Sequence, residues 1–409
     1  MARPHSSTIV DERAGPGEAE PSVHTFLRSR PARQQPAWDD PVAVHQVRTQ
    51  LAAKPPLVRA EDIALLRAQL AVAAAGTAYV LQAGDCAEDP NECTAGYVQR
   101  KAGLIDVLAG TLKMIGHRPV IRAGRIAGQF AKPRSHATET VNGQILPVFR
   151  GHLVNGPEPD PAARRPDPAR MLLCYDAAQE AMAHLGWGND DARWCADPPL
   201  WTSHEALVVD YEAPLLRRDG EGRLFLASTH WPWIGARTHD PAGMHVALLA
   251  AVANPVACKV SATTSARELL AVCARLDPGR EPGRLTLIAR MGATAVSDHL
   301  PPLVQAVRSA GHPVLWLTDP MHGNTRLTPE GYKTRYLDAV TSEVSDFQCA
   351  VRSVGGVAAG LHLEVTPDRV TECVLDESHA AQVSEKYTTL CDPRLNPEQA
   401  VAVVGAWRG

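Results

Sequence analysis

The stretch PVACKVSATTSARELLAVCARLDPGREPGRLTLIAR, residues 255–290, decides the fold. It contains an apolar run at 255–260, a helical segment at 265–276 and a second apolar run at 285–289. Apolar runs that alternate with helical segments are typical of parallel βαβ units. Lys259 and Arg290 end these runs, where an unpaired buried charge would be costly. We therefore predict two parallel strands that carry cations to one edge of a sheet.

The same alternation continues along most of the chain. Helical segments, such as residues 96–116 and 298–311, separate most of the apolar runs. Eight strand-like runs of this kind predict an α/β protein with a (β/α)8 TIM barrel. The runs lie at 79–82, 119–123, 200–203, 224–228, 255–260, 285–289, 313–317 and 361–365.

Composition divides the chain into three parts. Residues 1–36 are polar and rich in Pro, Gly, Arg and Glu, which predicts a flexible N-terminal segment. Residues 37–75 have helical periodicity, which predicts an N-terminal helical extension. Residues 76–409 form the predicted barrel, and the Pro-rich stretch at 156–170 belongs to a long excursion between its second and third strands.

Several classes of protein are disfavoured by composition. The net charge of −4 provides no basic field for nucleic acid, and no apolar run approaches the ~18 residues that span a membrane. The nine cysteines are scattered, which argues against a disulfide framework. No GxxxxGK[ST] loop or GxSxG elbow occurs. The N-terminus has no signal-peptide core, so we predict a cytoplasmic protein.

Charged or metal-binding residue types follow nearly every apolar run. In a barrel, the C-terminal ends of the strands meet at one face, where active sites lie. A barrel with only a structural role would not need such residues at every strand end. These strand-end residues are Asp85-Cys86, Arg125, His204-Glu205, 233–237, Lys259, Arg290, 319–324 and Glu364.

Four of these residue types suit a metal ion. A thiolate, an imidazole and two carboxylates fit a divalent transition ion such as Mn2+, Co2+, Fe2+ or Zn2+. Each residue also has an ordinary alternative, as core filler, surface group, salt-bridge partner or turn residue. The candidates are Cys86, His322, Glu364 and Asp392.

A second group is cationic. Several cations at one barrel mouth would bind an anionic substrate, although some could be solvated surface charges. Trp233, in HWPWIG, could line the same pocket, but its pattern favours the core. The cations are Arg125, Lys132, Arg134, Arg237, Lys259, Arg290, Lys333 and Arg335.

A dozen short motifs together resemble class II 3-deoxy-7-phosphoheptulonate (DAHP) synthases. The resemblance implies condensation of phosphoenolpyruvate with D-erythrose 4-phosphate and water, giving DAHP and phosphate at the start of the shikimate pathway. The motifs run in the family's order from about residue 79 to 396. They include LQAGDCAE (81–88), RAGRIAGQFAKPRS (122–135), WTSHEALVVDYE (201–212), STHWPWIGART (228–238), DPMHGNT (319–325), GLHLEVT (360–366) and CDPRLN (391–396).

The resemblance also implies roles for individual residues. The metal ligands would be Cys86, His322, Glu364 and Asp392, with Mn2+ or Co2+ foremost and Zn2+ or Fe2+ as alternatives. Phosphoenolpyruvate would meet Arg125, Lys132, Lys259 and Arg290, with backbone support near Ala236 and Arg237. The aldose phosphate would meet Arg134, Ser135 and Arg237, and Trp233 would line the pocket. The implied catalytic residues are Lys132, Lys259, His322 and Glu364.

The chain departs from the family pattern at Ala236, at His152 and at residues 261–262. These changes leave open the same chemistry on an amino analogue of erythrose phosphate. They also leave open a catalytically silent paralogue that regulates a partner enzyme. The chain is short for the class. In this it resembles the short members that serve secondary metabolism, and its length predicts weak feedback inhibition by aromatic amino acids. We expect a homodimer, the commonest symmetric assembly.

Overall fold

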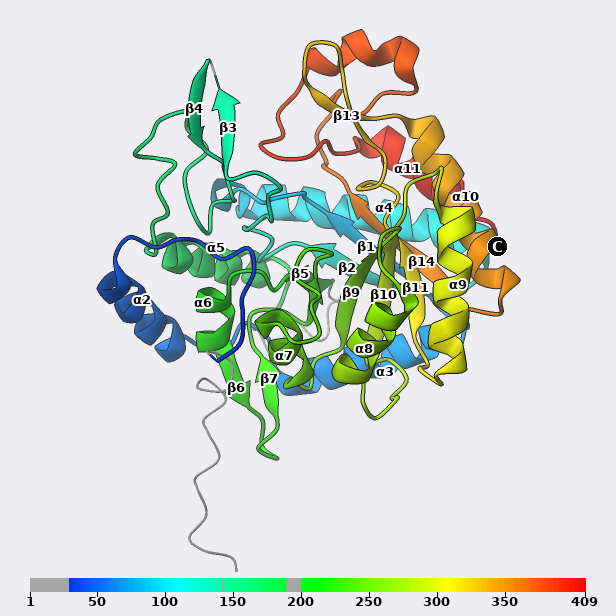
Figure 1. Ribbon diagram of the computed structural model, residues 1–409, viewed down its shortest axis with the longest axis horizontal. Coiled ribbons are helices and arrows are strands. Elements are labelled where there is room, and N and C mark those ends of the chain that lie inside the picture. Colours follow the sequence, from blue (N-terminus) through cyan, green and yellow to red (C-terminus); the bar gives the residue numbers. More distant parts are fainter. Residues whose placement is uncertain (1–28, 142, 189–199) are drawn as a thin grey trace, which may run out of the picture.

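Eight parallel strands close into a barrel at the centre of the computed structural model, which describes residues 29–141, 143–188 and 200–409 (Figure 1). The first strand in the chain pairs with both the second and the last, which closes the cylinder. The predicted TIM barrel is confirmed. Its strands are β1 (Tyr79–Gly84), β2 (Val120–Arg125), β5 (Trp201–Glu205), β8 (Trp231–Ile234), β9 (Val256–Ser261), β10 (Leu285–Arg290), β11 (Leu315–Thr318) and β14 (Ala358–Glu364).

The helices between the strands form an outer layer around this barrel (Figure 1). Within residues 255–290, the helix α8 (Ala266–Leu276) begins directly after Ser265. The Ser265 side chain caps it by accepting a hydrogen bond from the Glu268 backbone N–H. Its apolar residues face the barrel, as the periodicity predicts. The outer helices are α4 (Ala95–Gly116), α7 (Met244–Ala250), α8 (Ala266–Leu276), α9 (Val296–Ser309), α10 (Leu337–Ser353) and α11 (Pro397–Gly405).

The run at 224–228 is not a barrel strand, so this part of the prediction is wrong. It contains β7 (Leu224–Leu226), which pairs antiparallel with β6 (Leu216–Arg218) in a small hairpin. The Asn254 side chain bonds both backbone groups of Leu226 and ties the hairpin to the barrel. The fourth barrel strand is β8, a few residues further on. Apolar content alone does not distinguish a hairpin strand from a barrel strand.

Two helices precede the barrel, α2 (Pro41–Ala53) and α3 (Ala60–Ala74), where helical periodicity predicts them. Leu66 and Leu70 of α3 belong to the same buried cluster as Val80 and Ile288 of the barrel strands. The helix therefore covers the apolar interior of the barrel. Residues 1–28, most of the predicted flexible segment, lie outside the described residues, and so does Cys195. The three-part division of the chain stays a prediction.

Two excursions stand beside the barrel mouth as separate lobes (Figure 1). One follows β2 and holds the hairpin of β3 (Thr138–Val141) and β4 (Gln144–Pro147), then α5 (Arg170–His184). The other holds the hairpin of β12 (Thr325–Leu327) and β13 (Lys333–Arg335), together with the 3-10 helix η4 (Glu377–Ser384). Shorter elements are η1 (Pro90–Glu92), α6 (Val209–Glu212) and η3 (Ala213–Leu215). No helix in the described ranges is both long and apolar enough to cross a bilayer.

Candidate active site at the barrel mouth

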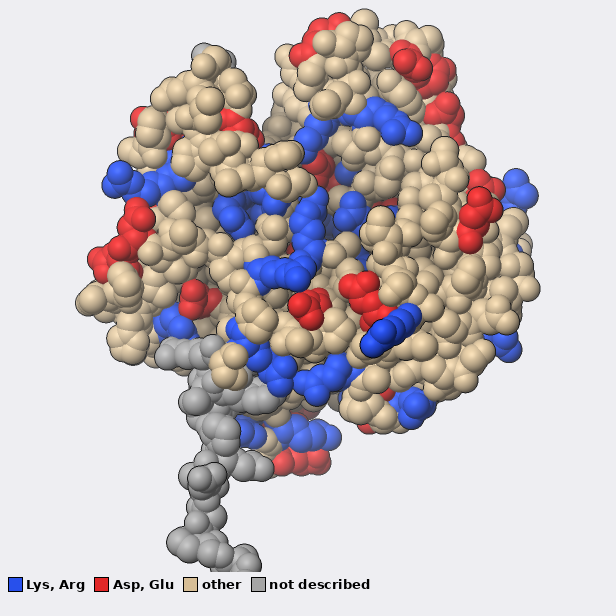
Figure 2. Space-filling view, viewed as in Figure 1, with Lys and Arg blue, Asp and Glu red and all other residues tan. Residues whose placement is uncertain are grey.

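A cleft opens at the C-terminal ends of the barrel strands. Lys and Arg side chains gather in the hollow between the two lobes (Figure 2). The nine residues predicted to bind substrate all line it, as do His322 and Asp392. The complete lining is Arg125, Gln129, Lys132, Pro133, Arg134, Ser135, Glu205, Trp233, Gly235, Ala236, Arg237, Lys259, Arg290, His322, Thr325, Lys333 and Asp392.

The four predicted metal ligands lie together, and two of them, His322 and Asp392, line the cleft. The donor atoms of Cys86, Glu364 and Asp392 lie within 4.8 Å of one another. His322 adjoins them, with its Nε2 3.2 Å from Glu364 Oε1. Cys86 also shares a small buried cluster with Cys391, and both thiols are free. A thiolate, an imidazole and two carboxylates at this spacing fit a divalent transition ion.

The orientation of His322 supports the same conclusion. Its Nδ1 lies 2.7 Å from Asp319 Oδ2. Burial would raise the pKa of Asp319, but His322 and Lys259 hold it well below the ordinary value. An ionised carboxylate only accepts hydrogen bonds, so Nδ1 of His322 donates to Asp319, and Nε2 is the ring nitrogen that faces the donor cluster. Metal-binding histidines are usually held in this way.

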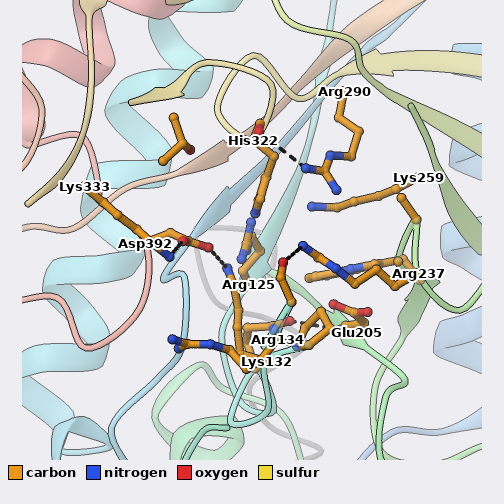
Figure 3. Close-up of a pocket in the computed structure, with 17 residues that line it drawn as sticks. Arg125, Lys132, Arg134, Glu205, Arg237, Lys259, Arg290, His322, Lys333 and Asp392 are labelled. Carbon is orange, nitrogen blue, oxygen red and sulfur yellow. Dashed lines mark hydrogen bonds and ion pairs between the residues drawn. The ribbon is translucent and has the colours of Figure 1, made fainter. Parts of the chain in front are cut away.

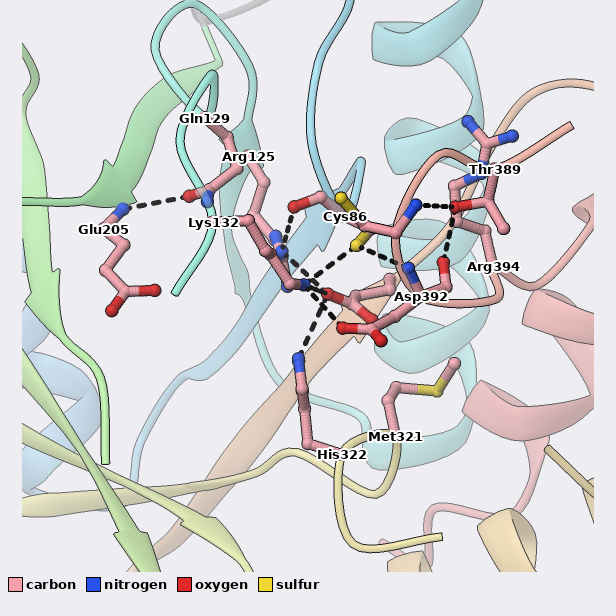
Figure 4. Close-up of polar contacts among 12 residues, drawn as sticks. Cys86, Arg125, Gln129, Lys132, Glu205, Met321, His322, Thr389, Asp392 and Arg394 are labelled. Atoms are coloured by element: carbon pink, nitrogen blue, oxygen red, sulfur yellow. Dashed lines mark hydrogen bonds and ion pairs between the residues drawn. The ribbon is translucent and has the colours of Figure 1, made fainter. Parts of the chain in front are cut away.

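Lys132 is the central cation of the donor cluster (Figure 4). Its Nζ lies 2.8 Å from Cys86 Sγ, 2.8 Å from Glu364 Oε1 and 3.1 Å from Asp392 Oδ2. Burial would raise the pKa of Glu364, but His322, Lys132 and Arg335 hold it well below its ordinary value. The buried carboxylate is therefore ionised, and the surrounding cations compensate its charge.

Trp233 lies beneath two of the cleft cations. The Arg125 guanidinium is 5.4 Å and Lys259 Nζ is 5.9 Å from the centre of its ring. Both distances allow cation–π attraction. The side chain is buried, as its pattern favours, and yet it lines the cleft. Trp233 is therefore both a buried core residue and a residue that lines the cleft.

Hydrogen bonds and ion pairs also hold other cations of the cleft (Figure 3). Arg237 Nη2 donates to Ser135 Oγ at 2.6 Å, and Arg290 Nη2 donates to the His322 carbonyl at 3.3 Å. Arg134 pairs with Glu139 of β3 at 3.1 Å. These contacts leave further guanidinium donors in a cleft rich in positive charge, where an anion would be bound through several hydrogen bonds.

Two glycines bring the loops of Arg290 and His322 together. Gly292 has φ +90°, a conformation that favours glycine. A Cβ on Gly323 would lie only 2.3 Å from the Gly292 backbone nitrogen. The loops after β10 and β11 can therefore touch backbone to backbone, which places the Arg290 side chain beside His322.

Gln129 and Glu205 also line the cleft, although Gln129 was not predicted and Glu205 was predicted only as a strand-end residue without a role. Gln129 Oε1 accepts a hydrogen bond from the Glu205 backbone at 2.9 Å. Burial raises the pKa of Glu205 although Lys259 and Lys132 oppose it. Its place at the end of β5 was the available signal. The neighbouring His204 instead bonds Glu212 at 2.9 Å.

Of the departures from the family pattern, only Ala236 lines the cleft. His152 lies 3.9 Å from Asp89, and Ser261 Oγ lies 3.2 Å from Thr264 Oγ1. Neither His152 nor Ser261 is among the lining residues. The departures at His152 and Ser261 therefore lie outside the lining of the cleft.

Together, these features define a TIM-barrel protein with a cation-rich cleft at the C-terminal ends of its strands and a possible divalent-ion site. The model of the class-II DAHP synthetase family matches residues 22–186 and 178–406. The chain belongs to this family, and its enzymatic activity is that of a DAHP synthase, which performs the first step of the shikimate pathway.

Curated proteins and solved structures agree with this assignment. A Pseudomonas fluorescens protein described as a "Probable phospho-2-dehydro-3-deoxyheptonate aldolase" is 54% identical over 92% of this chain and 94% of its own. Phospho-2-dehydro-3-deoxyheptonate aldolases from Streptomyces coelicolor and Neurospora crassa are 38% and 33% identical, over 94% and 91% of this chain and 96% and 91% of their own. A solved Francisella tularensis phospho-2-dehydro-3-deoxyheptonate aldolase has a TM-score of 0.51 at 14% identity, covering 90% of this chain and 97% of its own, which shows the shared fold.

Proposed function

We propose that the chain condenses phosphoenolpyruvate with D-erythrose 4-phosphate and water in a metal-dependent reaction that yields DAHP and phosphate. One observation carries this proposal. Cations from several strand ends converge on a cleft whose lining includes Asp392, a member of the Cys86–Glu364–Asp392 donor cluster. Two phosphorylated substrates need such compensation, because their negative charges repel each other as they approach.

We propose Cys86, His322, Glu364 and Asp392 as the ligands of a divalent ion, with Mn2+ or Co2+ foremost and Zn2+ or Fe2+ as alternatives. The mixed donor set and the Asp319 contact of His322 support this assignment. When bound, the ion supplies a Lewis acid that polarises the aldehyde oxygen.

The cleft has two groups of cations, which we assign to the two substrates. The inner group would bind the phosphate and carboxylate of phosphoenolpyruvate above Trp233, with backbone support near Ala236. The rim group would bind the aldose phosphate, so that the aldehyde carbon faces C3 of phosphoenolpyruvate. The inner group is Arg125, Lys132, Lys259 and Arg290, and the rim group is Arg134 and Arg237, together with the hydroxyl of Ser135.

In the reaction, C3 of phosphoenolpyruvate attacks the aldehyde, and water adds at C2 before phosphate leaves by C–O cleavage. Lys132 and Lys259 are buried cations that stabilise the anionic groups throughout. His322 and Glu364 lie next to each other, and either side chain could accept or donate a proton during the reaction. We propose these four as the catalytic residues.

The positions of the departures favour erythrose 4-phosphate over its amino analogue, since only Ala236 reaches the cleft. The intact donor cluster and buried cations argue against a silent regulatory paralogue.

We further propose that the protein is a cytoplasmic homodimer, that it serves secondary metabolism and that aromatic amino acids inhibit it only weakly. Within the described residues, the excursion between β2 and β5 holds only one hairpin and α5. Strong inhibition by Phe, Tyr or Trp would contradict the regulatory part.

The deciding experiment mixes the purified protein with phosphoenolpyruvate, erythrose 4-phosphate and Mn2+ and follows the loss of phosphoenolpyruvate absorbance. We expect consumption that requires the aldose, stops with a chelator and returns with added Mn2+. Consumption that is unaffected by exhaustive chelation would overturn the metal dependence. If phosphoenolpyruvate were consumed only with the amino analogue of erythrose 4-phosphate, that analogue would replace erythrose 4-phosphate as the proposed substrate.

A further inference from the structure

The Asp392 segment has little regular structure to hold it in place. It runs from the end of η4 at Ser384 to the start of α11 at Pro397. Its isolated bridge joins Leu395 to Val365. Cys86 likewise lies in the loop that follows β1. Two donor atoms that must keep a fixed spacing therefore come from two irregular segments.

Arg394 spans these two segments with a single buried guanidinium. Its Nη1 donates to Asp85 Oδ1 at 2.8 Å, directly before Cys86. Its Nη2 donates to Glu372 Oε1 at 2.9 Å, and its Nε lies 3.2 Å from Glu372 Oε2. The planar fork of arginine allows these directed bonds to form simultaneously.

Glu372 continues the connection into the backbone of the Asp392 segment. Its Oε2 accepts the Arg394 backbone N–H at 2.7 Å. Its Oε1 accepts the backbone N–H groups of Thr388 and Thr389 at 3.2 and 2.8 Å. The carboxylate therefore fixes the segment on both sides of Asp392.

Asp85 is anchored from the opposite side. Lys101 of α4 places its Nζ 2.7 Å from Asp85 Oδ2, and both side chains are buried. The carboxylate thus lies between two cations, Lys101 and Arg394, and cannot follow a movement of either loop alone. The chain Lys101–Asp85–Arg394–Glu372 joins a long barrel helix to the Asp392 segment without any proposed metal ligand as a member.

We infer that Arg394 is a positioning residue, and that its bridge between Asp85 and Glu372 sets the spacing of Cys86 and Asp392 and hence the affinity of the donor cluster for a divalent ion. This inference rests on the proposed metal site. Partners that orient metal ligands without touching the ion typically change its affinity by about 10–100-fold.

The test titrates full-length wild-type protein and Arg394→Lys with Mn2+ and follows free Mn2+ by electron paramagnetic resonance. Lysine keeps the charge but cannot bond Asp85 and both oxygens of Glu372 together. We expect the dissociation constant to rise about 10–100-fold. We also expect a changed cobalt–thiolate absorption band after Co2+ loading, since the distance between Cys86 and Asp392 relaxes.

Arg284→Lys is the matched control. Arg284 is also buried, but it donates to the carbonyls of Leu276 at 3.0 Å and Leu249 at 2.7 Å, away from the cleft residues. This variant should lose stability and keep wild-type Mn2+ affinity. Glu372→Gln serves as a second variant if Arg394→Lys does not fold, and it should weaken Mn2+ binding in the same direction.

The possible outcomes separate the two claims. Wild-type affinity in folded Arg394→Lys, or in folded Glu372→Gln, would overturn the positioning role and leave the metal site standing. Equal loss of affinity in Arg284→Lys would also overturn it, because the effect would then reflect general destabilisation. A wild-type protein that binds none of Mn2+, Co2+, Zn2+ and Fe2+ would overturn the proposed metal site and this inference together.

Discussion

Lys132 and Glu364 form a buried ion pair at the base of the cleft, with Lys132 Nζ 2.8 Å from Glu364 Oε1. The two residues lie far apart in the sequence, and they meet because β1 pairs with both β2 and β14. Glu364 is also 3.0 Å from Arg125 and 2.8 Å from Arg335. One buried carboxylate thus contacts three buried cations.

Glu364→Gln should destabilise the protein strongly. The change removes the anion that three buried cations face, and breaking a buried pair typically costs about 3–5 kcal/mol. The free energy of unfolding in urea, measured without added metal, checks the prediction. Glu385→Gln is the control, because Glu385 is exposed and should change stability by less than about 0.5 kcal/mol. Equal stability of both variants would show that the cations do not depend on Glu364.

Replacing an arginine of each cation group with lysine should separate the two substrates. Arg290→Lys should raise the KM for phosphoenolpyruvate by about 10-fold, with less effect on the aldose, because the fork to an anion is lost. Arg134→Lys should do the reverse. Steady-state kinetics with each substrate varied in turn provides the measurement. Equal changes in both KM values in either variant would argue against the assignment of the groups.

Cys86→Ser should change the metal preference of the site. Thiolates favour Zn2+ over Mn2+, whereas carboxylate and hydroxyl oxygens suit Mn2+. We expect the selectivity for Zn2+ over Mn2+ to fall by at least about 10-fold, or 1.4 kcal/mol. Competition titrations of the two ions on wild type and variant measure it. Cys349→Ser, a change at an exposed thiol, should leave the selectivity unchanged.

Glu343 should make stability depend on pH. It accepts hydrogen bonds from the backbone of Met291 at 3.1 Å and Gly292 at 2.9 Å, and from the Asn324 side chain at 2.7 Å. Burial raises its pKa from 4.5 to about 7. The folded state therefore binds the proton more tightly than the unfolded state. The resulting stabilisation is complete below about pH 4.5 and is lost as pH rises through about 7.

Glu343→Gln removes this titration, which provides the comparison. Between about pH 5 and about pH 8, the unfolding free energy of wild type should fall relative to the variant by roughly 2 kcal/mol. Urea unfolding at both pH values measures it. Parallel pH profiles of the two proteins would show that Glu343 titrates normally.

Local pattern was sufficient for seven of the eight barrel strands and failed for the fourth. The run at 224–228 and β8 are both short and apolar, and only pairing separates them, since Leu226 lies opposite Leu216 in a hairpin. Glu205 shows the same limit within the site. Its strand-end position was visible, but its place in the cleft depends on Gly235, where a Cβ would lie 2.2 Å from Glu205 Oε1.

The sequence by itself determined the βαβ alternation, the cations at the strand ends and the motifs of the family, because these properties depend on the order of residues along the chain. Tertiary structure alone decided which groups meet. Barrel closure brings Lys132 onto Glu364, and Arg394 ties the Asp392 segment to Asp85. Distances and buried charge balance depend on contacts between residues hundreds of positions apart, and no local pattern specifies them.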